Sequence, residues 1–274
     1  MDVSTAKHIT TITVPNCRYI VFKDGYAYVS SYAGPVLIDL NARLGYVAKI
    51  DTATMTVVDT CTVGYQPEEM VIKNNKLYVA NSGGYRVPNY DNTVSVIDLD
   101  SFTETKKIVA GINSHRLELD KYGFLYVSSR GDNYPSNPSR VYIIDTAKDY
   151  VTKVLELPVS NMTLSGDSLY AYSTEWSKQT ESNTISYAIV DTKSQTVISD
   201  NFITDGTEQN IDIPYGIVIN PETKEILITD AKDYITPGTL HCYSPEGEQK
   251  WSTVTGDIPA HIVFTDKKLK SNQQ

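Results

Sequence analysis

Two glutamates and two histidines are the candidates in this sequence for acid–base chemistry or metal binding. Glu68, Glu69, His115 and His261 each stand at the start of a short apolar run. Carboxylates and imidazoles that meet in one place can serve as general bases or as ligands of a divalent metal. The sequence contains no His-x-His pair and no motif of an activated nucleophile. We therefore predict no catalytic residues, no metal and no cofactor, and keep an enzyme as an alternative.

The apolar runs themselves define two positions at which the residue type varies. Six runs recur, at 19–22, 69–72, 116–119, 161–164, 216–219 and 261–264. The residues just before them are Arg18, Glu68, His115, Ser160, Tyr215 and Ala260. Their first residues are Tyr19, Glu69, Arg116, Asn161, Gly216 and His261. A structural position tends to repeat its residue type, so these varied and mostly polar sets are typical of a ligand site. The alternative is a solvated channel mouth.

Five long polar segments hold further candidates. They span 33–45, 83–92, 131–139, 175–184 and 232–238, which is long for connections between paired strands. Arg86 and the aromatic residues in or beside these segments are the candidates: Tyr32, Tyr85, Tyr90, Tyr134, Trp176 and Tyr234. Amphipathic rings can cover a large planar ligand. We predict that they bind a small molecule; alternatively, they only pack the loops together.

A repeat of about 47 residues must position these side chains. Strand-like segments such as KLYVANS (76–82) and FLYVSSR (124–130) recur, and so do TVSVIDL (93–99) and RVYIIDT (140–146). The aspartates that close the second kind of segment are Asp51, Asp98, Asp145 and Asp191, spaced by 47, 47 and 46 residues. We interpret these aspartates as turn residues, because the Asp side chain accepts backbone N–H bonds in turns.

Each repeat contains four strand-like segments, which predicts an all-β fold. Four-stranded antiparallel units of this length are typical of the blades of a β-propeller. We predict a single domain over 1–274 with five complete blades at about 17–64, 65–111, 112–158, 159–204 and 211–256. Stray strands are expected at 5–14 (an outer strand) and 260–265 (an inner strand). Such rings usually close by pairing strands from both ends. We therefore expect a longer chain, with seven blades or alternatively six, and an open ring here.

The composition narrows the possible partners. The net charge of −9 and the isoelectric point near 4.9 argue against nucleic-acid binding. The three cysteines, Cys17, Cys61 and Cys242, are far apart and have no metal-ligand spacing. Neither a membrane-spanning apolar stretch nor a secretion signal is visible in the sequence.

The repeat also carries a family resemblance. Leu77–Ser82 (LYVANS) and Asn92–Asp98 (NTVSVID) resemble the YVTN-type, YncE-like propellers, often described as surface-layer proteins. The segment Gly256–His261 (GDIPAH) and the Tyr-, Pro- and Asn-containing loops are more narrowly similar to the BtuG-type cobalamin-binding surface lipoproteins of gut Bacteroidetes.

This resemblance implies a function and a place. It implies a lipid-anchored protein on the outer membrane of a Gram-negative bacterium, with signal and anchor in sequence before this chain. It further implies capture of a corrinoid nutrient for a TonB-dependent outer-membrane transporter. A surface scaffold that binds a protein or a glycan is one alternative, and a propeller lactonase or lyase is another.

Overall fold

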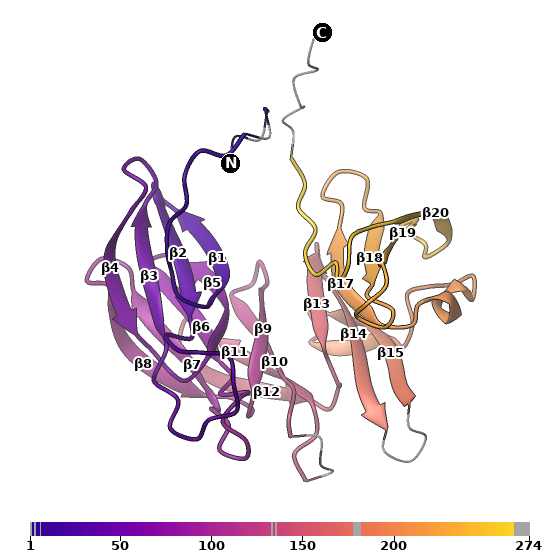
Figure 1. Cartoon of the computed structure of the whole chain (residues 1–274). Coiled ribbons are helices and arrows are strands. Elements are labelled where there is room, and N and C mark those ends of the chain that lie inside the picture. The colour runs from indigo at the N-terminus through magenta and orange to yellow at the C-terminus, as the bar shows by residue number, and fades with distance from the viewer. Residues whose placement is uncertain are drawn as a thin grey trace, which may run out of the picture.

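Five four-stranded antiparallel sheets follow one another along the chain and form an arc of propeller blades (Figure 1). The computed structural model describes residues 2, 4–5, 7–132, 134, 136–177 and 182–265. In every sheet the strands pair in the order in which they occur in the sequence. The predicted all-β propeller fold, with five complete blades, is therefore confirmed.

The strands of each blade run from the innermost to the outermost. Blade 1 contains β1 (Cys17–Lys23), β2 (Tyr26–Ser31), β3 (Tyr46–Asp51) and β4 (Thr56–Thr62). Blade 2 contains β5 (Pro67–Lys73), β6 (Lys76–Asn81), β7 (Thr93–Asp98) and β8 (Thr103–Val109). Blade 3 contains β9 (Ser114–Leu119), β10 (Phe124–Ser129), β11 (Arg140–Asp145) and β12 (Tyr150–Leu155). Blade 4 contains β13 (Asn161–Ser165), β14 (Ser168–Ser177), β15 (Ser182–Asp191) and β16 (Thr196–Ser199). After a short 3₁₀ helix (Thr207–Asn210), blade 5 contains β17 (Pro214–Ile219), β18 (Ile226–Asp230), β19 (Thr239–Tyr243) and β20 (Gln249–Val254).

The hydrophobic core lies between neighbouring blades. Leu77, Tyr78, Val79 and Ala80 of β6 are all fully buried, although successive side chains of a strand point to opposite faces. Leu77 and Val79 pack toward blade 1, whereas Tyr78 and Ala80 pack toward blade 3. The second strand of a blade is thus apolar throughout because both of its faces are covered.

The repeated Asp-Thr pair fixes the turn between the third and fourth strands. Asp51 accepts hydrogen bonds from the backbone N–H groups of Ala53 and Thr54. The Thr52 hydroxyl donates to the carbonyl of Gly25, which lies in the turn between β1 and β2. Asp98, Asp145 and Asp191 accept equivalent backbone bonds. The structural interpretation of these aspartates is confirmed.

The connection in blade 4 differs from the sequence prediction. A loop was expected over 175–184, but β14 continues to Ser177 and β15 begins at Ser182, with Trp176 opposite Asn183. The physical reason is the uninterrupted alternation along β14, which keeps Tyr172, Thr174 and Trp176 on one face. Trp176 is therefore held by a paired strand rather than by a loop.

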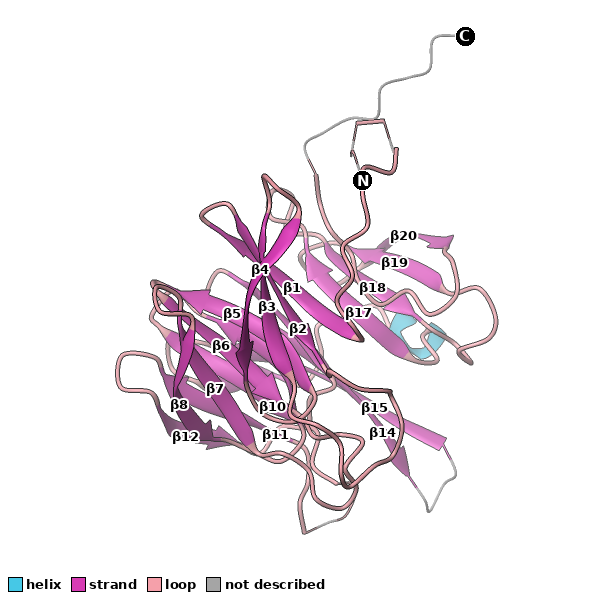
Figure 2. Ribbon diagram, turned by 60° about the vertical axis from the view of Figure 1, so that its left-hand side comes forward, coloured by secondary structure: helices cyan, strands magenta, loops and turns pink. Residues whose placement is uncertain are grey.

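The two stray terminal strands are also corrected. Residues 7–14 and 259–265 have no regular structure. A strand needs a partner for its backbone hydrogen bonds, and within the described residues no strand pairs with either segment. Instead, Ile12 and Val14 pack against Ala27 and Val29 of blade 1. Both end segments lie between blade 1 and blade 5 (Figures 1 and 2).

Candidate functional site

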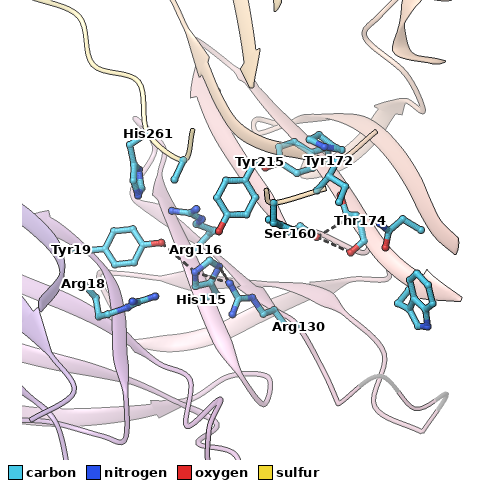
Figure 3. A pocket seen from close by; sticks show the side chains of 16 residues that line it. Arg18, Tyr19, His115, Arg116, Arg130, Ser160, Tyr172, Thr174, Tyr215 and His261 are labelled. Atoms are coloured by element: carbon cyan, nitrogen blue, oxygen red, sulfur yellow. Dashed lines mark hydrogen bonds between the residues drawn. The ribbon is translucent and has the colours of Figure 1, made fainter. Parts of the chain in front are cut away.

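A cavity of about 550 Å³ lies where the innermost strands begin (Figure 3). Blade 1, blade 3, blade 4, blade 5 and the segment after blade 5 all contribute to its wall. The lining residues are Arg18, Tyr19, His115, Arg116, Arg130, Ser160, Tyr172, Thr174, Trp176, Asn183, Ile213, Pro214, Tyr215, Tyr234, Ala260 and His261.

Eight of the sequence-predicted candidates meet in this cavity: Arg18, Tyr19, His115, Arg116, Trp176, Tyr215, Tyr234 and His261. Ser160 and Ala260, from the variable position before the apolar runs, also line it. Arg18 and Tyr19 lie near the start of the chain and His261 lies near its end, yet the rings of Tyr19 and His261 meet edge to face at 5.7 Å. The segment after blade 5 is held there because the Thr229 hydroxyl donates to the carbonyl of Pro259.

A hydroxyl on the second strand shapes the start of the innermost strand. The backbone N–H of Tyr19 donates to Ser30 Oγ at 3.1 Å, and that of Arg116 donates to Ser128 Oγ at 2.9 Å. The strand pairing shifts at both places. Such a bulge redirects the side chains beside it, which turns Tyr19 and Arg116 toward the cavity.

His115 is the buried centre of the polar wall. Its Nε2 lies 3.2 Å from the Tyr19 hydroxyl, and Nη2 of Arg130 lies 2.9 Å from Nδ1. Burial, followed by the positive charges of Arg130 and Arg116, holds the pKa of His115 well below its usual value. The imidazole is therefore neutral at neutral pH, and its 3.9 Å approach to Glu68 is not an ion pair.

Three other candidates support the wall from behind and do not line the cavity. Glu68 accepts a hydrogen bond from the Tyr32 hydroxyl, and its other oxygen lies 3.6 Å from Nε of Arg18. Glu69 accepts a hydrogen bond from the backbone N–H of Leu117 at 2.9 Å. Asn161 donates to the carbonyl of Tyr215 at 3.1 Å.

The remaining aromatic-loop candidates are not brought to the cavity. Tyr32 is buried, with Arg18 above its ring at 4.9 Å and Tyr85 edge-on to it at 6.3 Å. The guanidinium of Arg86 lies over the ring of Tyr65 at 3.5 Å. Tyr90 and Tyr134 are also absent from the lining. The alternative interpretation, that loop aromatics pack the loops, thus describes Tyr32 and Tyr85.

Sequence reasoning missed several lining residues. Arg130 follows β10 directly, at the position that Tyr32 and Ser82 occupy in the first two blades, so the repeat itself could have found it. Tyr172 and Thr174 share a face of β14 with Trp176, and the alternation could have found them. Ile213, Pro214 and Asn183 gave no comparable signal.

The residues that the structure describes show no metal-binding cluster and no membrane-spanning helix. Among them, no three or more His, Cys, Asp or Glu side chains gather in a way that could hold a metal ion. Within the same part of the chain, no helix has the length and apolar character to cross a membrane.

Comparisons with known proteins show similarity in structure but not in sequence. No family model and no curated protein sequence match the chain. Among solved structures, hydrazine synthase from Kuenenia stuttgartiensis is similar with a TM-score of 0.66 and 17% identity, over 93% of this chain and 70% of that one. The Dos1 propeller is similar with a TM-score of 0.60 and 13% identity, over 90% of this chain and 64% of that one. At these identities the likeness concerns the propeller fold alone.

Proposed function

We propose that this propeller is a ligand-binding protein that holds a large, partly planar nutrient of the corrinoid type at the mouth of its central channel. The observation that carries the proposal is the cavity of about 550 Å³ in which aromatic rings, guanidinium groups and imidazoles converge. Concave sites with aromatic walls and a few convergent polar groups are the usual form of small-molecule sites.

The chemistry of the wall supports binding more than catalysis. Tyr19, Tyr172, Tyr215, Tyr234 and Trp176 offer ring faces and edges, which suit a broad, flat molecule. The neutral His115 is enclosed by Tyr19 and Arg130, so its nitrogens serve to hold these side chains. Binding needs shape and many modest contacts but no reacting group.

The resemblance to BtuG-type surface lipoproteins supports the finer part of the proposal. In that setting the protein would be anchored by lipid on the outer membrane and would pass its ligand to a TonB-dependent transporter. A surface scaffold that binds a protein or glycan remains the alternative use of the same face.

Isothermal titration calorimetry with cobalamin and with cobinamide tests the proposal. Binding of either corrinoid, together with co-purification of the colour after incubation and gel filtration, would support it. If neither corrinoid gives heat and neither is retained, the corrinoid assignment is wrong.

A further inference from the structure

The positive charges at the cavity are only partly balanced. Arg18 and Arg116 approach the carboxylates of Glu68 and Glu69 at 3.6 Å and 3.9 Å. Arg130, in contrast, has no carboxylate within ion-pair distance among the residues that the structure describes; its nearest polar partner is the neutral His115. One full positive charge is therefore left to face the cavity.

Arg116 supplies a second, independent observation. Its side chain is only 10% exposed, and its Nε–H has no hydrogen-bond partner among the described residues. A buried donor without a partner is unfavourable. Arg116 also lines the cavity, and the unpartnered Nε–H leaves its positive charge less neutralised by the protein.

Two neighbouring titratable groups bear on the charge balance at the cavity. The pKa of His261 is lowered by burial and then by the charges of Arg116 and Arg18. Burial and the nearby Glu69 raise the pKa of Glu118, which does not line the cavity, to about 8. Glu118 is therefore mostly protonated at pH 7 and does little to offset the arginines.

We propose that Arg18, Arg116 and Arg130 form a subsite for an anionic group of the ligand, a phosphate or a carboxylate. Figure 3 shows the three side chains gathered around His115 at one end of the cavity. The planar guanidinium fork matches two oxygens of such an anion. This inference rests on the proposed function, since it names the chemistry of one part of the same ligand. The anionic group of the ligand would lie beside Tyr19 and His115, and its larger apolar part would lie against the aromatic wall of blade 4.

The test uses inorganic phosphate and citrate as probes, titrated calorimetrically into the full chain at low ionic strength. The variant is R130Q, because Arg130 is exposed and its replacement should not disturb folding. R43Q is the matched control, since Arg43 is an exposed arginine in the connection between β2 and β3 and does not line the cavity. Thermal melts of both variants verify the fold.

We expect phosphate, citrate or both to bind at millimolar concentrations or below, and R130Q to weaken that binding about tenfold or more, as for the loss of a charge-assisted hydrogen bond. R43Q should stay within about twofold of the unchanged protein. Whichever probe binds more tightly identifies the anion type. The subsite is refuted if neither anion binds, or if R130Q and R43Q behave alike.

The corrinoid titration keeps the two proposals separate. Cobalamin binding that phosphate does not compete with and that R130Q does not weaken would refute the anion subsite and leave the binding function standing. Phosphate binding that depends on Arg130, without any corrinoid binding, would refute the corrinoid proposal and support the subsite.

Discussion

The Tyr32 hydroxyl donates a hydrogen bond to the carboxylate of Glu68, and both side chains are buried beneath the cavity rather than in it. The pair joins the end of β2 in blade 1 to the start of β5 in blade 2. Glu68 in turn approaches Arg18 and His115. A tyrosine expected to touch the ligand thus acts by holding the acidic support of the polar wall.

Tyr32→Phe should therefore destabilise the fold. The substitution leaves one oxygen of a buried carboxylate without its strongest donor, which is unfavourable by about 1–3 kcal/mol. Urea unfolding measures the change in the free energy of unfolding. The control is Tyr150→Phe, because Tyr150 at the start of β12 is half exposed. Equal stability of the two variants would contradict the role given to Tyr32.

Gly111 is expected to tolerate no side chain. A Cβ there would lie 2.3 Å from a ring carbon of Tyr142 and 2.4 Å from Ser129 Cβ. Gly111→Ala should thus lower the free energy of unfolding by about 1–3 kcal/mol, as other overpacked substitutions do. Gly256→Ala is the control, because a Cβ at Gly256 meets nothing within 4 Å. Thermal or urea unfolding of the two variants should differ clearly.

Glu118 should make stability depend on pH. Its pKa is raised by burial and by Glu69 to about 8 in the folded protein, above the value of about 4.3 for an unfolded chain. The folded state therefore binds more protons, and stability falls as pH rises from about 4.3 to about 8, by at most about 1.4 kcal/mol per pH unit.

The Glu118→Gln variant isolates this contribution. It should lose the part of the pH dependence that Glu118 causes and be more stable than the unchanged protein at pH 8. Urea unfolding of both proteins at pH 5 and pH 8 gives the difference. Parallel pH profiles of the two proteins would show that Glu118 is not held protonated.

The two tryptophans provide a matched pair for ligand binding. Trp176 lines the cavity and Trp251 does not, although both are about half exposed. Trp176→Ala should weaken corrinoid binding about tenfold, in the range for a central aromatic contact. Trp251→Ala should leave the affinity unchanged. Calorimetric titration of both variants checks this, and an equal effect would place the ligand elsewhere.

The fold could be predicted from the sequence because its determinants are local and repeated. Alternating strand segments, short turns and the Asp51–Thr52 type of pair recur at a fixed spacing, and each blade needs only its neighbours to bury its faces. The same alternation along β14 also encoded its extension through Trp176. The terminal segments were mispredicted because strand-like residues form no strand without a partner.

The site was decided by the tertiary structure. The repeat identified equivalent positions on different blades, but not which of them face one cavity. That depends on the bulges that turn Tyr19 and Arg116 inward, and on the position of residues 259–261 beside blade 5, from which His261 reaches Tyr19. Glu68 and Arg130 look alike in sequence as polar residues near strand ends. Only the packing of the blades across the arc buries Glu68 and leaves Arg130 as an unbalanced charge at the cavity. The reason is that burial and charge pairing depend on distances between residues far apart in the chain.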